Sequence, residues 1–331
     1  ELLAPYMDRG LFDPGEDGAS RAKTEALAVD WLKEGGKRFR PFVTLAAYAV
    51  ARHGKAALQC HADLAQIIPT PVRRLALAIE ALHKASLVHD DIEDGSPFRY
   101  GRATLHQEHG IPVALNVGDY LVGLGYRLVV GARGELGTEC VADIMEHLTA
   151  AHLQLCRGQG AELETDASSK DVGPMDVLGI HAMKTAPAFH VALYAGLRAA
   201  NAAPEVSLLR RFSAYLGEGY QIINDLDDWR ADGRNKVESG QDVGLLRPTI
   251  LRAFALEAGA GRSLEQAAKA ATHQERSALT REVYEKAGAF EKAESLVAKL
   301  RERALKVSME LDDAPTRELF GFLVCVVLDS N

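Results

Sequence analysis

Apolar residues recur at helical spacing along nearly the whole chain. Leu75, Ile79 and Leu82, for example, fall on one face of a helix. Such patterns predict helices near residues 20–34, 41–54, 72–94, 111–132, 137–157, 174–200 and 205–231, and shorter ones near 247–258, 263–271, 275–288, 290–311 and 316–328. No segment shows the apolar–polar alternation that is typical of a half-buried strand, so no sheet is expected. The sequence therefore predicts an all-α protein.

The chain shows little sign of division into domains. Residues 1–19 are interrupted by prolines and glycines and are expected to form a loose lead-in segment. Residues 20–331 contain no internal repeat, low-complexity tract or interdomain linker. We therefore expect them to form a single all-helical domain.

Composition narrows the class of protein. The chain has 331 residues, 47% of them hydrophobic, and a formal net charge of −8, which argues against a nucleic-acid-binding surface. Its four cysteines lack CxxC spacing, which favours a reduced, cytoplasmic protein. No apolar run reaches the roughly 18 residues that a membrane span needs. No signal-peptide pattern is found, although the chain begins at Glu1 without Met and an upstream segment could be missing.

The first candidate site closes the long predicted helix at 72–94. Asp90, Asp91 and Asp94 stand in its last turn, where the helix dipole disfavours carboxylates. Asp90 and Asp94 lie one turn apart on the same face, about 6 Å along the axis. A cation that neutralises the cluster would explain it, and oxygen-only ligands favour Mg²⁺ over zinc. The alternative is an ordinary solvated acidic helix end.

A second acidic cluster ends the predicted helix at 205–231. Asn224, Asp228 and Asp232 recur at every fourth position down one face, and Asp225 lies beside this stripe. Two acid-tipped helices about 130 residues apart could face each other across a cavity and share Mg²⁺ ions. Unbalanced carboxylates in an apolar bundle would otherwise carry a large desolvation cost.

Basic residues occur where an anion would need them. Gly36 opens a flexible turn that carries Lys37, Arg38 and Arg40 and leads into a predicted helix, a natural phosphate site. Further cations follow the first acidic turn, interrupt an apolar helix or flank a glycine-containing loop: Arg99, Lys184 (followed by Thr185), Lys236 and Arg247. Singly, each could be a solvated surface cation. Together they offer charge for more than one diphosphate, bridged to the carboxylates by Mg²⁺.

Taken together, these motifs resemble those of the trans-isoprenyl diphosphate synthases (polyprenyl synthetases). The resemblance extends from about residue 25 to the C-terminus, and the motifs agree in order and spacing. The matching residues are His83, Ser86–Leu87 and His89 before Asp90-Asp91-x-x-Asp94, the segment 99–106, Gly118–Asp119, Gly158–Gln159, Lys184–Thr185, Tyr220–Ile222, the 224–228 cluster, and Asp242 to Thr249. The resemblance implies a single bundle of about a dozen helices around a central cavity, as in isoprenoid synthases.

The activity that the resemblance implies is a Mg²⁺-dependent, head-to-tail condensation of isopentenyl diphosphate with an allylic diphosphate, which gives an all-trans polyprenyl diphosphate. The allylic diphosphate ionises, the double bond of isopentenyl diphosphate attacks the cation, and a proton is lost to the departing diphosphate. Up to three Mg²⁺ ions are expected to take part. The resemblance also implies a homodimer, with a hydrophobic product that could be passed to a membrane.

The resemblance assigns roles residue by residue. Isopentenyl diphosphate is expected to bind to Gly36, Lys37, Arg40 and Arg73. The allylic diphosphate is expected to bind to Arg99, Lys184, Lys236 and Arg247. The Mg²⁺ ions are expected to bind to Asp90, Asp91, Asp94, Asn224, Asp225 and Asp228. The allylic cation is expected to be stabilised by the carbonyls and dipoles of Lys184, Thr185 and Gln221.

Ala85 and Ser86 are candidates for setting product length. They precede Asp90 by five and four residues, one turn deeper on the helix along which the prenyl tail is expected to run. Bulky aromatic residues there would form a floor and stop chain growth early, whereas both of these residues are small. We therefore expect a product of geranylgeranyl length or longer. The alternative is that these residues are small only to let two helices pack closely.

Three positions depart from the family pattern. Tyr100 stands where most members have a second Arg, Asn224 replaces the first Asp of the second motif, and Val72 stands where many long-chain members have a diphosphate-binding His. Two other functions therefore stay open: a class I terpene cyclase on the same fold, or a non-catalytic subunit that modulates another synthase. A cyclase would not need Lys37 and Arg40, and a modulating subunit would normally have an eroded first aspartate motif.

Overall fold

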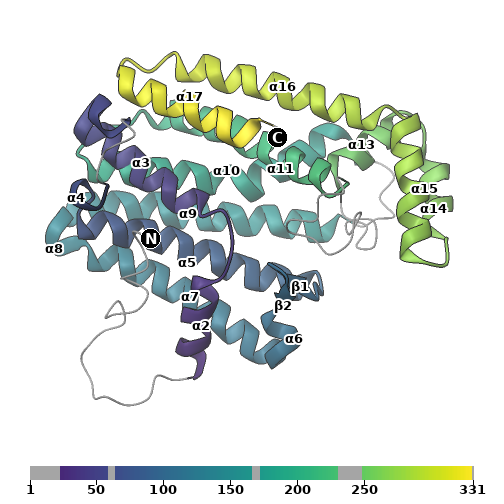
Figure 1. Ribbon diagram of the computed structural model, residues 1–331, viewed down its shortest axis with the longest axis horizontal. Helices are drawn as coiled ribbons and strands as arrows, with labels where there is room; N and C mark the ends of the chain where they lie inside the picture. Colours follow the sequence, from purple (N-terminus) through teal and green to yellow (C-terminus); the bar gives the residue numbers. More distant parts are fainter. Residues whose placement is uncertain (1–22, 59–63, 166–171, 230–247, 330–331) are drawn as a thin grey trace. The chain divides into compact units, whose positions relative to one another are not determined.

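The computed structural model describes residues 23–58, 64–165, 172–229 and 248–329, and this part of the chain is almost entirely helical (Figure 1). The earlier elements are α2 (Lys23–Lys33), α3 (Phe39–His53), a 3-10 turn η1 (Gly54–Leu58), α4 (Leu64–Ile67), α5 (Thr70–Glu93), strands β1 (Phe98–Arg99) and β2 (Arg102–Ala103), α6 (Leu105–His109), α7 (Ile111–Gly131) and α8 (Arg133–Leu136). The later elements are α9 (Thr138–Glu164), α10 (Pro174–Ala199), α11 (Val206–Asp227), α13 (Ile250–Glu257), α14 (Gly261–Ala268), α15 (His273–Lys286), α16 (Ala289–Ser308) and α17 (Ala314–Leu328). The prediction of an all-α protein is confirmed, and every predicted helical segment overlaps one of these helices.

The chain divides into two compact units, which are described separately. The first consists of residues 1–150 and 191–206, and the second of residues 151–190 and 207–331. The boundaries fall within helices α9 and α10 and at the start of α11 rather than in a linker. The expectation of a single domain over residues 20–331 stays a prediction.

The first unit contains a short hairpin that the sequence pattern does not predict. Strands β1 and β2 pair antiparallel, with Arg99 opposite Arg102. The two turn residues between them, Tyr100 and Gly101, both have positive φ (55° and 79°), as in the tight turns that join twisted hairpin strands. Strands of two residues are too short to show apolar–polar alternation, which is why the expectation of no sheet is wrong here.

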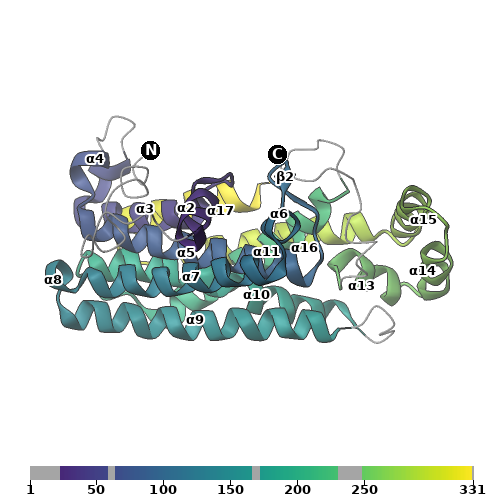
Figure 2. The same ribbon diagram turned by 90° about the horizontal axis from the view of Figure 1, so that it is seen from below.

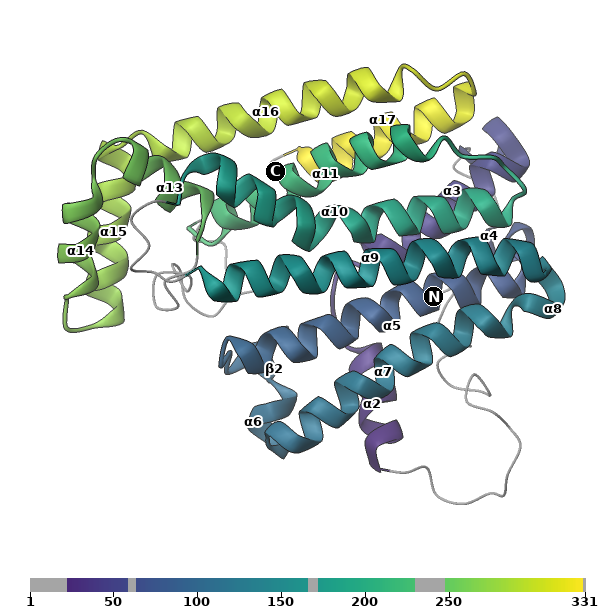
Figure 3. The same cartoon turned by 180° about the vertical axis from the view of Figure 1, so that it is seen from behind.

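Helix α5 packs against α7, α3 and α2, and its run alongside α7 can be followed in Figures 1 and 3. Glycines on α7 permit the close approach. A Cβ at Gly125 would lie 2.6 Å from Leu82 Cγ, and one at Gly118 would collide with the imidazole of His89.

Helix α5 ends where the sequence predicts, because Gly95 follows it with a φ of 62° and stops the helix.

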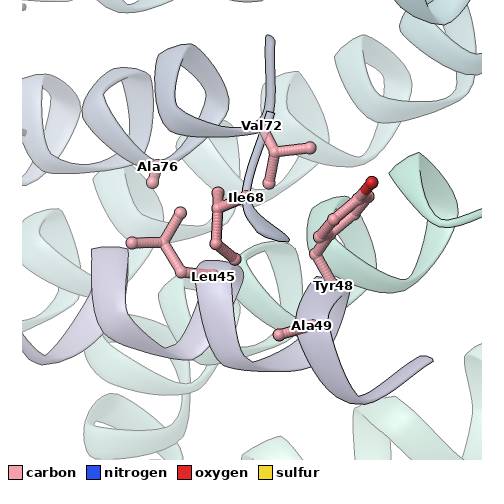
Figure 4. Close-up of a cluster of buried hydrophobic side chains, with 6 residues drawn as sticks. All are labelled: Leu45, Tyr48, Ala49, Ile68, Val72 and Ala76. Carbon is pink, nitrogen blue, oxygen red and sulfur yellow. The ribbon is translucent and has the colours of Figure 1, made fainter. Parts of the chain in front are cut away.

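Figure 4 shows a cluster of buried apolar side chains around the N-terminal end of α5. Its members come from α3 (Leu45, Tyr48 and Ala49), from the segment before α5 (Ile68) and from α5 itself (Val72 and Ala76). Val72 is fully buried in this cluster. In the structure, Val72 therefore serves the apolar core.

The second unit is held together by close helix contacts and aromatic pairs. A Cβ at Gly217 of α11 would lie 2.6 Å from the backbone N of Ala186 in α10, so these two helices approach closely. The rings of Phe212 in α11 and Phe320 in α17 have centroids 4.3 Å apart. Helices α16 and α17 run side by side, and α14 and α15 form a second pair that is also clear in Figure 2.

Within the described residues, the helical stretch Ile111–Leu136 is long and apolar enough to cross a membrane. A single helix of this kind is weak evidence for a span, because the core helix of a soluble protein has the same length and composition. Helix α7, which makes up most of the stretch, packs against α5 and α2. Part of its apolar surface, 44% of the most apolar window, is buried against the rest of the protein.

Candidate active site

The first acidic cluster ends α5, and Arg99 of the hairpin lies against it. Arg99 Nε and Nη2 each lie 2.7 Å from Asp91 Oδ1, and Nη2 lies 3.4 Å from Asp90 Oδ2. Asp91 is buried, whereas the side chain of Asp90 is 25% exposed. The hairpin therefore brings a cation to acids at a helix C-terminus, where the helix dipole would otherwise disfavour them.

The same cluster is the candidate site for Mg²⁺. Its ligands are carboxylate oxygens alone, the donor type that Mg²⁺ prefers. Among the residues that the structure describes, however, no three His, Cys, Asp or Glu side chains converge closely enough to hold a metal ion. Asp91 is engaged by Arg99, so Asp90 and Asp94, one turn apart, are the carboxylates that an ion would meet first. The donor chemistry fits a hard divalent cation, but these carboxylates do not enclose one.

The basic turn leads into α3, as predicted. Gly35, Gly36 and Arg38 all have positive φ (24°, 88° and 50°), so the chain turns tightly between α2 and α3. Arg38 donates from Nη1 to Glu80 Oε1 (2.5 Å) and from Nη2 to the carbonyl of Glu34 (2.8 Å). Arg38 thus ties the turn to α5, and its guanidinium is engaged by Glu80 and by the carbonyl of Glu34.

Arg40 follows in the first turn of α3 and lies against His83 of α5. Its Nη1 is 3.0 Å from Nε2 of His83. Burial lowers the pKa of His83 well below its usual value, and the charges of Arg40, Lys84, Arg99 and Arg38 lower this pKa further. His83 is therefore neutral at neutral pH and can accept a hydrogen bond from Arg40. We call Arg38, Arg40, Lys84 and Arg99 the basic cluster.

The structure does not bring together all the residues predicted to bind isopentenyl diphosphate. Lys37, which is exposed, lies in the turn before α3, and Arg40 lies in the first turn of that helix. Arg73 lies toward the other end of α5, 11 residues before Lys84 of the basic cluster, a separation of about 17 Å along the helix. Its Nε donates to the carbonyl of Ile68 (2.9 Å), so Arg73 supports the start of α5. The structure therefore gives Arg73 a role remote from the basic cluster.

The sequence prediction omits two residues that shape this site, Glu80 and Lys84, and it gives no binding role to a third, His83, which it names only as part of the family motif. They share one face of α5, and Glu80 and Lys84 are buried (2% and 0% exposed). A lysine inside an apolar helix is the signal that indicates a site at Lys184, and the same signal is present at Lys84. His83 precedes Asp90 by seven residues, or two turns, which places both on the same face.

The two candidate chain-length residues differ in exposure. Ala85 is buried, whereas Ser86 is exposed and its Oγ donates to the carbonyl of His83 (2.8 Å). A large side chain at Ala85 would overpack the core. A large side chain at Ser86 has room, so Ser86 offers the clean test of chain length.

In the second unit, the residues expected to stabilise an allylic cation lie on α10 and α11. Thr185 Oγ1 donates to Gln221 Oε1 (3.3 Å). Lys184 forms an ion pair with Glu162 of α9, and Gly158 of α9 packs against the backbone of Lys184. Glu162 thus offsets the cost of a lysine in an apolar helix. The structure brings Thr185 and Gln221 into contact. Lys184 directly precedes Thr185 in the chain.

The second acidic cluster ends α11. Asp225 and Asp228 are buried, and Asn224 is partly buried. Asp225 Oδ2 accepts the backbone N–H of Ile250 (2.9 Å), the first residue of α13, and thereby anchors the start of that helix. Nε2 of His181 lies 3.7 Å from the same oxygen, too far for a hydrogen bond. Burial, and then the charge of Lys184, lowers the pKa of His181 to about 3.

Two of the predicted ligands of the allylic diphosphate, Lys236 and Arg247, lie outside the described residues, as does Asp232 of the acidic stripe. Their roles stay predictions. The other two predicted ligands, Arg99 and Lys184, are each engaged by a carboxylate in this structure.

Comparison with known proteins gives one family match, two related enzymes and one similar solved structure. A family model described as polyprenyl synthetase matches residues 22–287. The geranylgeranyl diphosphate synthase of Cereibacter sphaeroides is 28% identical over 251 residues, which cover 74% of this chain and 79% of that enzyme. The octaprenyl diphosphate synthase of Escherichia coli is 29% identical over 228 residues, which cover 68% of this chain and 64%, just under two thirds, of that enzyme. The crystal structure of a geranylgeranyl pyrophosphate synthase from Corynebacterium glutamicum matches with a TM-score of 0.82 over 100% of this chain and 97% of that chain, and its 21% identity supports the fold alone.

Asp91→Asn should destabilise the protein more than Asp90→Asn. Asp91 is buried and accepts two short bonds from Arg99, so its substitution is expected to lower the free energy of unfolding by roughly 1.5–3 kcal/mol. Asp90 is 25% exposed and farther from Arg99, so its substitution should cost less than about 1 kcal/mol. Urea denaturation of the two variants measures the difference. Equal losses of stability would contradict this ranking by burial.

Proposed function

The chain belongs to the polyprenyl synthetase family, and from this membership we propose that it catalyses the Mg²⁺-dependent, head-to-tail condensation of isopentenyl diphosphate with an allylic diphosphate. It is a prenyltransferase, and its relatives are named as synthases of geranylgeranyl and octaprenyl diphosphates. The proposed product is an all-trans polyprenyl diphosphate.

One observation carries the proposal: basic side chains from the turn before α3, from α3, α5 and the hairpin gather beside His83 of α5 (the basic zone), and the acids gather two turns farther along the same helix (the acidic zone). His83, beside the basic cluster, precedes Asp90 of the acidic cluster by seven residues, about 10 Å along the helix. Arg99 contacts the acids and also contributes to the positive field at His83. A diphosphate can bind directly to the basic zone, whereas the acidic zone would bind one only through a cation. An enzyme that binds two diphosphate substrates at once needs two separate binding places, and the basic and acidic zones would provide them.

We assign isopentenyl diphosphate to the basic zone, with Lys37 and Arg40 as ligands, and the allylic diphosphate to the acidic zone. Asp90, Asp91 and Asp94 would hold Mg²⁺, which supplies positive charge to the diphosphate as it leaves. The Corynebacterium glutamicum structure is described as complexed with isoprenyl diphosphate and magnesium, which supports this choice of ion.

The residues that the family resemblance assigns to the allylic cation lie on α10 and α11. Thr185 and Gln221, joined by a hydrogen bond, would present their oxygen dipoles to the positive charge, together with the carbonyl of Lys184. Binding both substrates at adjacent zones would hold the double bond close to the cation. The apolar helices would exclude water, which would otherwise quench the cation as an alcohol. No protein base is assigned, because the departing diphosphate would take the proton.

The basic turn before α3 and the acidic cluster of α5 also separate the proposal from its alternatives. A terpene cyclase on the same fold takes one diphosphate substrate and would not need Lys37 and Arg40. A modulating subunit would not need the intact Asp90, Asp91 and Asp94. Because the turn and the cluster are both whole, they favour the synthase.

We further propose that the enzyme is a cytoplasmic homodimer. Ile111 and Leu115, one turn apart on α7, are 52% and 44% exposed, which supports an apolar interface on that helix.

Incubation with labelled isopentenyl diphosphate tests the proposed activity. With Mg²⁺ and dimethylallyl, geranyl or farnesyl diphosphate, offered separately, label should appear in a longer polyprenyl diphosphate. Asp90→Ala and Asp94→Ala should lower turnover by about 100-fold or more, while circular dichroism shows unchanged helix content. Consumption of an allylic diphosphate without isopentenyl diphosphate would indicate a cyclase instead. No product with any primer would indicate a modulating subunit.

Product length is expected to be geranylgeranyl or longer, because Ser86 is small and exposed. Ser86→Phe should shorten the product, since the new ring would occupy the path of the prenyl tail, and the control Ser86→Ala should not. Chromatography of the dephosphorylated products measures their length. A wild-type enzyme that stops at farnesyl diphosphate, or a Ser86→Phe variant with an unchanged product, would refute this expectation.

A further inference from the structure

Lys84 is a fully buried lysine on the face of α5 that meets the basic turn (0% exposed). Its Nζ donates to the carbonyls of Glu34 (2.5 Å) and Gly35 (3.4 Å). These residues directly follow α2, which ends at Lys33, so their carbonyls are among the groups that a helix end leaves without helical partners. An ammonium group at this point also meets the negative end of the helix dipole.

Two aromatic rings cover this ammonium group. Lys84 Nζ lies 4.4 Å from the ring centroid of Tyr100 and 5.4 Å from that of Trp31, within the range of cation–π attraction. Trp31 Nε1 in turn donates to the carbonyl of Lys84 (3.2 Å). Tyr100 also packs on the basic turn, where a Cβ at Gly35 would lie 2.6 Å from Tyr100 Cγ. Lys84 therefore joins the end of α2, helix α5 and the hairpin.

Lys84 acts on the turn together with Arg38. The carbonyl of Glu34 accepts from both Lys84 Nζ and Arg38 Nη2. Arg38 is held in turn by Glu80, which lies one turn before Lys84 on α5. Arg40 comes two residues after Arg38, so the same face of α5 sets the position from which Arg40 is presented.

Packing alone does not explain a lysine at this position. Burial, and then the charge of Arg38, lowers the pKa of Lys84 to about 8, which reflects the cost of burying an ammonium group. An apolar side chain of similar length would avoid this cost. The charge instead adds to that of Arg40 in the field at His83, where the proposed function puts an anion.

We propose that Lys84 is a positioning residue of the isopentenyl diphosphate site: its ammonium group holds residues 34–40 in the anion-binding conformation and adds positive charge beside Arg40. This inference rests on the proposed function, because it requires isopentenyl diphosphate to bind at this turn. Lys84 lies under the ring of Tyr100 and acts through Lys37 and Arg40 rather than by touching the substrate.

Binding of isopentenyl diphosphate alone, without an allylic primer, tests the inference in the absence of turnover. Lys84→Met keeps the length of the side chain but removes its charge, and should raise the Kd measured by calorimetry by about tenfold or more. The control Lys33→Met removes an exposed charge from the same end of α2 and should change the Kd by less than about twofold. In steady-state assays, Lys84→Met should raise KM for isopentenyl diphosphate and leave KM for the allylic primer unchanged.

The pH dependence of binding is a readout that a purely structural lysine would not move. The charged and titratable groups around Lys84 come from the basic turn, from α5 and from the hairpin: Glu34, Arg38, Glu80, His83, Arg99 and Tyr100. Lys84 loses its proton as the pH rises through about 8, which removes a cation from the site. The wild-type Kd should therefore rise between about pH 7 and about pH 9, and the Kd of Lys84→Met should stay flat. The wild-type arm does not depend on whether the variant folds.

The outcomes separate the inference from the function on which it rests. An unchanged Kd in Lys84→Met, or a wild-type Kd that is the same at both pH values, would overturn the inference and leave the proposed function intact. Wild-type protein that binds no isopentenyl diphosphate and gives no product with any primer would overturn both.

Discussion

The buried charges of helix α5 are the constraint on which the candidate site of the first unit depends. Glu80 and Lys84, one turn apart, lie in an otherwise apolar stretch, and each needs a partner to offset its desolvation. The partners come from the turn after α2: Arg38 for Glu80, and main-chain carbonyls for Lys84. The observed turn conformation serves both charges, and it leaves Arg40 beside His83.

The charged groups proposed to act on substrates are held in place before any substrate binds. Arg99 is paired with Asp91, Lys184 with Glu162, and Asp225 with the start of α13. Groups that are already oriented need little reorganisation when charge develops on a leaving diphosphate, which is the basis of electrostatic preorganisation. A diphosphate that binds here would exchange one set of charge partners for another, so no charge need be left buried and unpaired.

Much of the fold could be predicted from the sequence, because helical periodicity depends only on neighbouring residues. The end of α5, with Asp90 in its last turn, is of this kind. The contact of Arg99 with that end could not be predicted, because it depends on a hairpin too short to show a strand pattern. Lys84 carries the same signal as Lys184, a lysine in an apolar helix, and could have been found. The assignment of Arg73 to the isopentenyl diphosphate site stays a prediction: Arg73 lies 11 residues before Lys84 on α5, about 17 Å along the helix, and donates to the carbonyl of Ile68.

Calorimetry in the presence of a chelator tests the division between the basic and the acidic zone most directly. Isopentenyl diphosphate should bind with EDTA present, because Arg40 and its neighbours supply protein cations for it. Geranyl diphosphate should bind only after Mg²⁺ is added in excess, because Asp90 and Asp94 cannot bind an anion without a cation between them. Isopentenyl diphosphate that requires Mg²⁺, or geranyl diphosphate that binds equally well with EDTA, would contradict the division.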